Sequence, residues 1–190
     1  MNAIRFVLAL LDASGGRLQG RTLLQKKAYF ASLLSGVDPG LDFNAHYYGP
    51  YSAVLDSTVG QLKNLGFIGE DSTGYGVSSE GFELRRYDYA LSSDGKKLVA
   101  TFRNSEEYRR VASAVAKIKA AGEPGYLELS IAAKTYFILD KRNKPMSNSE
   151  IKREAEKSFN WNIQPQSLER AVRFLQQVDL TERTEGKRAS

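Results

Sequence analysis

Residues 89–98, Tyr89-Ala90-Leu91-Ser92-Ser93-Asp94-Gly95-Lys96-Lys97-Leu98, decide the fold of this chain. They follow an alternating segment, FELRRYDYA at positions 82–90, which is typical of a β-strand. Asp94-Gly95 then opens a long helix that continues to Ile118, with a break near Asn104. We therefore expect a strand that runs directly into a helix at this point.

The residues before this stretch predict a β-hairpin and three helices. Residues 67–91 alternate and carry Gly74, Gly76 and Gly81, which indicates a hairpin with a mobile tip at residues 71–81. Before the hairpin, residues 43–48 predict a short strand. The expected helices are residues 2–13, ended by Ser14-Gly15-Gly16; residues 20–34; and residues 51–65, opened by Gly49-Pro50 and ended by Gly66.

The helix expected at residues 20–34 has one lysine, Lys27, inside its apolar arc. We interpret Lys27 as a lysine whose stem packs while its ammonium reaches water; the alternative is a lysine directed at a ligand or phosphate. The arc contains Leu23, Phe30 and Leu34, and the opposite side carries Thr22, Gln25, Tyr29 and Ser32.

Three more helices are expected after the glycine- and proline-containing segment at residues 121–125. The first, residues 126–139, is almost continuously apolar and should be central and buried. The second begins at Ser147, with Glu150 forming a capping box, and the third begins at Pro165. This pattern predicts a first domain at residues 1–100, a helical subdomain at residues 101–180 and a disordered tail at residues 181–190.

The order helix, helix, helix, hairpin, helix is that of a winged helix-turn-helix domain. The opening stretch also resembles the Y-x-L-T-x-x-G ending of many winged-helix regulators, with Ser92 where threonine is usual. We therefore expect a mainly α protein with a small β-hairpin, built as a winged helix-turn-helix followed by a helical subdomain.

The composition of the 190 residues excludes several classes of protein. There is no cysteine, which excludes disulfides, thiol chemistry and cysteine-bound zinc. No apolar run is long enough to span a membrane, and residues 1–16 lack the features of a signal peptide. We expect a cytoplasmic protein without membrane contact.

The net charge of +5 is distributed unevenly along the chain. Residues 1–100 carry ten basic and ten acidic side chains, whereas residues 101–190 carry 17 basic and 12 acidic side chains. The whole basic surplus therefore lies outside the predicted winged-helix domain, although phosphate neutralisation dominates affinity for DNA.

The expected function is that of a DNA-binding transcriptional regulator. In such a domain the third helix enters the major groove of double-stranded DNA and the hairpin contacts the backbone. The helix at residues 51–65 contains Asn and Gln, which can read adenine, but no arginine. The candidate DNA-binding residues are Arg21, Lys26, Ser57, Gln61, Lys63, Asn64, Arg85 and Arg86.

A second basic set lies on the last two expected helices, which are joined by a turn containing Trp161. These helices could mimic a helix-turn-helix. The favoured interpretation is a solvated face, because Glu150, Glu154, Glu156 and Glu169 interleave with the basic residues. The basic set comprises Lys152, Arg153, Lys157, Arg170 and Arg173.

The sequence predicts no enzymatic activity, no cofactor and no metal site. His46 is the single histidine, so it has no second histidine or cysteine with which to bind a transition metal. We expect it to be packed or to cap a turn. A hydrolase or nuclease would need an acidic cluster that the sequence does not display.

A pattern of residues within about positions 17–70 links the chain to a known group. It consists of GRTLLQK at positions 20–26, Tyr29-Phe30, Phe43, HYYGPYS at positions 46–52, Leu55, Leu62, GFI at positions 66–68 and Glu70. This pattern resembles the YwgA-like group of prokaryotic proteins. A weaker similarity is to the Panacea antitoxin-associated domain. The resemblance implies a winged-helix fold and a regulatory or mobile-element context, and it implies no chemistry.

The aromatic run supports an alternative function, a non-enzymatic and antitoxin-like module that binds another protein. Its candidate partner-binding residues are His46, Tyr47, Tyr48 and Tyr51, whose rings can form a platform with hydroxyl tips. A rigid turn between helices is the competing interpretation. A homodimer through the apolar residues 126–139 is a further expectation.

Overall fold

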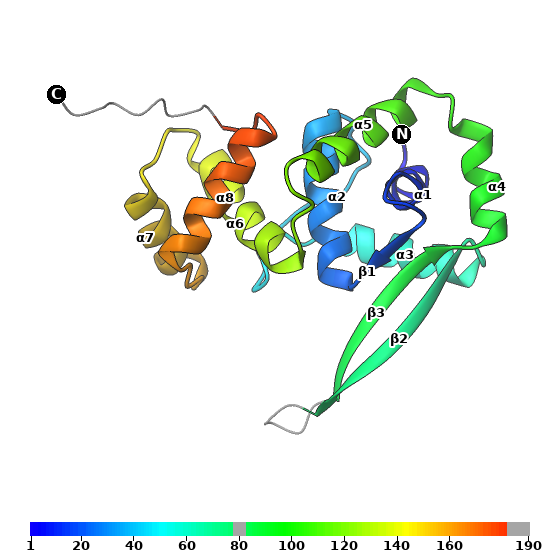
Figure 1. Ribbon diagram of the computed structural model, residues 1–190, viewed down its shortest axis with the longest axis horizontal. Helices are drawn as coiled ribbons and strands as arrows, with labels where there is room; N and C mark the ends of the chain where they lie inside the picture. Colours follow the sequence, from blue (N-terminus) through cyan, green and yellow to red (C-terminus); the bar gives the residue numbers. More distant parts are fainter. Residues whose placement is uncertain (78–82, 182–190) are drawn as a thin grey trace.

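The protein is a helical body from which a two-stranded arm projects (Figure 1). The computed structural model describes residues 1–77 and 83–181. The helices are α1 (Ala3–Ala13), α2 (Arg21–Ser35), α3 (Ala53–Asn64), α4 (Ser93–Phe102), α5 (Glu106–Ala120), α6 (Tyr126–Arg142), α7 (Asn148–Phe159) and α8 (Pro165–Gln177), and the strands are β1 (Arg17–Gln19), β2 (Ile68–Val77) and β3 (Glu83–Leu91). The expectation of a mainly α protein with a small β component is confirmed.

The sheet has three antiparallel strands in the order β1-β3-β2. The expected hairpin is present, and its two strands are longer than expected. Strand β2 includes residues 71–77, which the sequence assigns to the tip. The rest of that predicted tip, residues 78–81, lies outside the described residues. Strand β1 was not expected; it pairs with β3 from Arg17↔Ala90 to Gln19↔Asp88, but three residues are too few to show alternation in a sequence.

The junction between β3 and α4 is formed by residues 89–98. The Ser92 hydroxyl oxygen accepts a hydrogen bond from the Gly95 amide (3.0 Å) and donates one to the Gly66 carbonyl (2.7 Å). The first turn of α4 also lies so close to β2 that a Cβ on Gly95 would be 2.2 Å from the Phe67 carbonyl oxygen. This serine and this glycine thus join the strand and the helix to the turn after α3.

One expected helix break is confirmed, and one helix start and one strand need correction. The helix predicted from Asp94 to Ile118 is interrupted near Asn104 as expected, because α4 ends at Phe102 and Ser105 caps α5. The third helix begins at Ala53, because Ser52 is its N-cap and accepts a hydrogen bond from the Leu55 amide. Residues 43–48 form no strand; a single bridge joins Asn44 to Tyr51.

Two hydrophobic clusters share helix α2. The first gathers α1, whose residues 6–11 are completely buried, with α3, the base of the sheet, α4 and most of α5. The second gathers α6, α7 and α8 with Tyr29 and Phe30 of α2 and with Ile118 of α5. The division expected at residue 100 falls within α4, and the change from one cluster to the other comes near Ile118.

Helix α6 is central to the second cluster, as its composition predicts. Leu129, Ala133 and Ile138 are buried within this chain, so they are not available to the homodimer that their apolar character suggested. Tyr126 and Leu127, at the start of α6, are its large exposed apolar residues. Of the expected disordered tail, residues 182–190 lie outside the part of the chain that the structure describes.

Candidate functional site

The connection between α2 and α3 contains a compact loop of residues 44–51, here called the tyrosine loop. It is closed by two backbone hydrogen bonds of 2.9 Å between Asn44 and Tyr51, one in each direction. Inside it, the Gly49 amide donates to the His46 carbonyl at 2.9 Å, and Gly49 has a φ of +94°, which glycine adopts without strain. The loop therefore has a defined backbone of its own.

The tyrosine loop presents its rings to solvent. Tyr47 and Tyr48 are 68% and 56% exposed, and their ring centroids lie 4.9 Å apart in an edge-to-face arrangement. The His46 ring is also exposed and lies 5.2 Å from the Tyr51 ring and 6.4 Å from the Tyr48 ring. His46 is therefore not packed, which was one of the two roles expected for it, and the four rings form one continuous surface.

Two buried side chains of α2 hold the end of the loop. The Gln25 amide makes a reciprocal pair with Ser52: its nitrogen donates to the Ser52 carbonyl at 3.0 Å, and its oxygen accepts from the Ser52 amide at 2.9 Å. The neighbouring Lys26 ammonium donates to the Pro50 carbonyl at 2.6 Å. Both side chains are almost completely buried, so these polar contacts replace their contacts with water.

The second cluster holds the other side of the loop. The indole N–H of Trp161, which is buried, donates to the His46 carbonyl at 2.9 Å. The Lys134 ammonium lies 5.2 Å from the Trp161 ring and 5.8 Å from the Tyr47 ring. Contact with α6 is close, because a Cβ on Gly49 would be 3.1 Å from the Lys134 Cγ atom. The loop is thus fixed from both hydrophobic clusters.

Lys26 is the lysine that the fold buries, whereas the sequence singled out its neighbour Lys27. Removal from water, together with the nearby positive charge of Lys134, lowers the pKa of the Lys26 ammonium to about 7. Burial also lowers the pKa of Lys27, which is only partly exposed, and that of Lys134. A neutral amine at position 26 can still donate to the Pro50 carbonyl, so the contact does not need the charge.

Stability should therefore rise with pH through Lys26. Its pKa is about 7 in the folded chain and near 10.5 in the unfolded chain, so between these values the unfolded chain holds more protons. The free energy of unfolding then increases with pH, by at most about 1.4 kcal/mol per pH unit. Urea denaturation at pH 7.5, 8.5 and 9.5 measures the free energy of unfolding of the wild type and of Lys26→Met. As the pH rises, the free energy of unfolding of the wild type should increase relative to that of the variant. A difference that stays constant with pH would contradict the assignment.

The candidate DNA-binding residues lie on α3, at the start of α2 and along β3, with one exception. Ser57, Gln61 and Asn64 are exposed along α3, and Arg85 is exposed on β3, where it donates to the Ser72 hydroxyl at 3.3 Å. Lys26 does not lie on this face, because its ammonium is buried against Pro50.

Carboxylates accompany most of the basic groups on this face. Arg21 lies 3.6 Å from Asp56, Arg86 donates to the buried Asp88 at 3.1 Å, and Lys63 pairs with Glu70. The Asp88 carboxylate also accepts a hydrogen bond from Arg17 at 3.3 Å. Each of these pairs satisfies a positive charge within the protein and weakens its attraction for phosphate.

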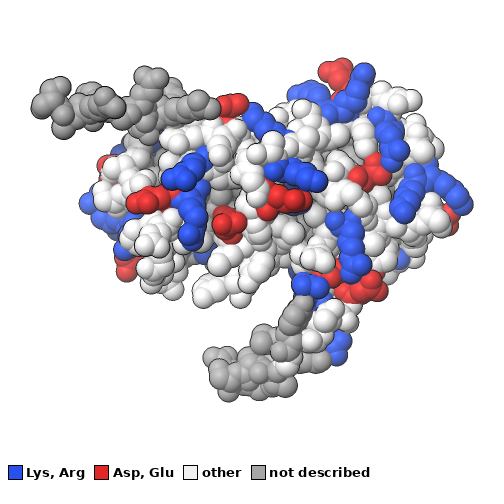
Figure 2. All heavy atoms as spheres, viewed as in Figure 1, with Lys and Arg blue, Asp and Glu red and all other residues white. Residues whose placement is uncertain are grey.

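The charges on the face seen in Figure 2 are mixed. Lysine and arginine side chains occur there in separate groups, with aspartate and glutamate between several of them and broad uncharged areas around them. The second basic set is exposed on α7 and α8, where Arg142 of α6 also pairs with Glu154. Trp161, in the turn between α7 and α8, is buried in the core and contacts the tyrosine loop, a contact that the sequence does not predict.

Within residues 1–77 and 83–181, no three His, Asp or Glu side chains lie close enough together to hold a metal ion. No helix in these residues has the length and apolar character needed to cross a bilayer. No protein-family model matches the sequence, and no curated protein matches it. The contacts of the tyrosine loop and of α3 are therefore the observations from which a function can be inferred.

Proposed function

We propose that this chain is a winged-helix protein that recognises a partner protein through the tyrosine loop. The sheet order β1-β3-β2, the helices α1 to α3 before the hairpin and the entry of β3 into α4 support the winged-helix assignment. The connection between α2 and α3, residues 36–52, is longer than the short turn of a simple helix-turn-helix, and the tyrosine loop forms its second part.

A single observation carries the proposed function: the tyrosine loop exposes aromatic rings although hydrogen bonds from three buried side chains fix its backbone. Gln25, Lys26 and Trp161 make the contacts that fix the loop, yet Tyr47 and Tyr48 remain mostly exposed. Tyrosine is enriched among the residues that dominate protein interfaces, and a surface that is already ordered loses little entropy on binding. An antitoxin-like role is the form of this proposal that the Panacea resemblance suggests.

Affinity capture from the native host tests this proposal. The wild type and a Tyr47→Ser/Tyr48→Ser variant, each immobilised, would be exposed to the same lysate and the bound proteins quantified by mass spectrometry. We expect a protein that the wild type retains and the double variant loses, and its purified form should bind the variant at least about tenfold more weakly.

Leu65→Ser is the control for this experiment, because Leu65 is 62% exposed at the end of α3, outside the tyrosine loop. This variant should retain the same partner as the wild type. If the tyrosine variant retains every protein that the wild type retains, recognition does not use the loop.

Duplex DNA is the second candidate partner, and the exposed face of α3 favours it. Ser57, Gln61 and Asn64 lie four and three residues apart, which places them on one side of the helix next to the arm. Their hydroxyl and amide groups could read base edges, in keeping with a transcriptional regulator.

A fluorescence titration with random-sequence duplex DNA at low salt tests this second candidate. Binding should weaken steeply as salt is added, and it should weaken further in the Arg85→Gln variant. Absence of binding at low salt, where phosphate contacts are strongest, would remove DNA as a partner.

A further inference from the structure

One end of the tyrosine loop carries positive charge that no acid balances. None of the loop residues, positions 44–51, is acidic. The Lys134 ammonium of α6 lies 5.8 Å from the exposed Tyr47 ring and 5.2 Å from the Trp161 ring. Among the described residues no carboxylate pairs with Lys134, so aromatic faces are its partners there.

A second amine lies near Lys134. Burial, together with the positive charge of Lys134, lowers the pKa of Lys26, and burial also lowers the pKa of Lys134. Both amines therefore stand where removal from water disfavours their charge and no anion compensates for it. A carboxylate that approaches Lys134 would offset the repulsion between the two amines, and partly buried charges attract it with little screening by salt.

The opposite end of the loop is already balanced in charge. Burial and the negative charge of Asp56 raise the pKa of the Tyr51 hydroxyl, which places the Asp56 carboxylate near that end. Asp56 in turn lies 3.6 Å from Arg21. The loop is thus polar along its length, and an anionic group is favoured at the Tyr47 end rather than at the Tyr51 end.

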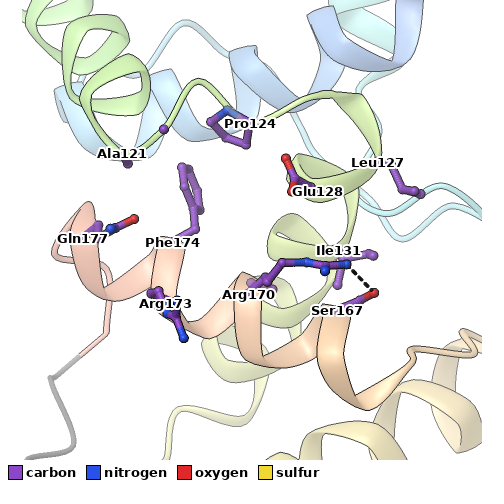
Figure 3. Close-up of a pocket in the computed structure, with 12 residues that line it drawn as sticks. Ala121, Pro124, Leu127, Glu128, Ile131, Ser167, Arg170, Arg173, Phe174 and Gln177 are labelled. Carbon is purple, nitrogen blue, oxygen red and sulfur yellow. Dashed lines mark hydrogen bonds between the residues drawn. The ribbon is translucent and has the colours of Figure 1, made fainter.

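The arginines of α8 show what the Tyr47 end has in addition. They line a pocket of about 320 Å³, where Arg170 donates to the Ser167 hydroxyl and points away from Arg173 (Figure 3). Phe174 in the same pocket is 6% exposed and packs on the Phe30 ring. That pocket therefore presents no exposed ring beside its charges, whereas the Tyr47 end of the tyrosine loop does.

We propose that the partner contacts the tyrosine loop with an acidic segment, one of whose aspartate or glutamate side chains pairs with Lys134. The apolar part of the same segment covers the Tyr47 and Tyr48 rings. Complementary charge then sets the direction in which the segment lies on the loop. This inference rests on the proposed function and adds the chemistry of the partner to it.

Selection of random-sequence peptides displayed on phage, with the immobilised full chain as target, tests the proposal. The relevant peptides are those that the wild type enriches and the Tyr47→Ser/Tyr48→Ser variant does not, and they should be rich in aspartate and glutamate. The strongest would be synthesised with each acidic residue in turn replaced by its amide. In fluorescence anisotropy, one such replacement should weaken binding to the wild type at least about tenfold.

Lys134→Met connects this preference to Lys134, because methionine keeps a side-chain stem beside Gly49 and removes the charge. The variant should bind the acidic peptide and its amide form equally. The matched control is Lys141→Met, two turns later on α6, where the ammonium lies 4.9 Å from the Phe137 ring and outside the tyrosine loop. It should keep the preference of the wild type.

Acetylation of the wild type with an activated acetate ester, followed by mass spectrometry, gives a second measurement that needs no variant. The acidic peptide should suppress acetylation of Lys134 and leave that of Lys141 unchanged. Unchanged acetylation of Lys134, selected peptides without acidic residues, or a preference that Lys134→Met retains would each overturn the proposal and leave the loop as a binding surface. If the tyrosine variant enriches the same peptides as the wild type, or if the wild type enriches none, the proposed function itself fails.

Discussion

Replacing Trp161 with alanine should lower the free energy of unfolding by about 3–5 kcal/mol, the range for large aromatic residues removed from a core. The indole is buried, stacks on the Phe159 ring with centroids 4.5 Å apart and lies near the Phe137 ring. It also makes the hydrogen bond to His46 that ties the tyrosine loop to the second cluster. The substitution therefore removes core packing and releases one side of the loop.

Urea denaturation followed by circular dichroism measures this loss; fluorescence is unsuitable because Trp161 is the single tryptophan. The Trp161→Phe variant separates the two contributions, since phenylalanine keeps a ring but leaves the His46 carbonyl without its donor. It should cost less than alanine, about 1–3 kcal/mol. A loss below 1 kcal/mol for Trp161→Ala would show that neither contribution operates.

Replacing Gly95 with alanine should destabilise the protein by about 3 kcal/mol, a large effect for one methyl group. The added Cβ would stand 2.2 Å from the Phe67 carbonyl oxygen and 3.3 Å from a methyl carbon of Leu91. The obstructing atom belongs to the backbone, so a side-chain rotation cannot relieve the collision. Helix α4 would have to move away from the base of β2, which breaks the junction that Ser92 makes.

Gly60→Ala is the matched control for this prediction. Gly60 lies inside α3, and no atom outside its own helix is within 4 Å of a Cβ added there. Alanine should therefore stabilise the helix by about 0.5–1 kcal/mol. Thermal denaturation of both variants should shift in opposite directions; a Gly95→Ala protein as stable as the wild type would contradict the close approach of α4 to β2.

The junction around Ser92 could be predicted from the sequence because all of its information is local. Alternation indicates the strand, and the serine and glycine that follow mark the start of the next helix. Strand β1 could not be predicted, since Arg17–Gln19 is held only by pairing with β3, some seventy residues later in the chain. The alternating pattern that identifies a strand needs more than three residues.

The tyrosine loop was recognised from its composition, but not the residues that hold it. Helix α2 lies between two hydrophobic clusters, so a prediction based on one apolar arc assigned Gln25 and Tyr29 to the solvent side, and both are buried. For the same reason the single-arc prediction singled out Lys27, whereas the buried lysine is its neighbour Lys26. Trp161 is 115 residues from His46 in sequence, and no local pattern connects them.

The central claim is that a partner covers the tyrosine loop, and hydrogen–deuterium exchange with the captured partner tests it most directly. Exchange would be compared, residue by residue, in the free protein and in the complex. We predict slower exchange on binding in residues 44–52, and unchanged exchange in α3 beyond its first turn and in the arm. Protection of α3 and β3 with no change in the loop would contradict the claim and would place recognition on the face that a winged helix uses for DNA.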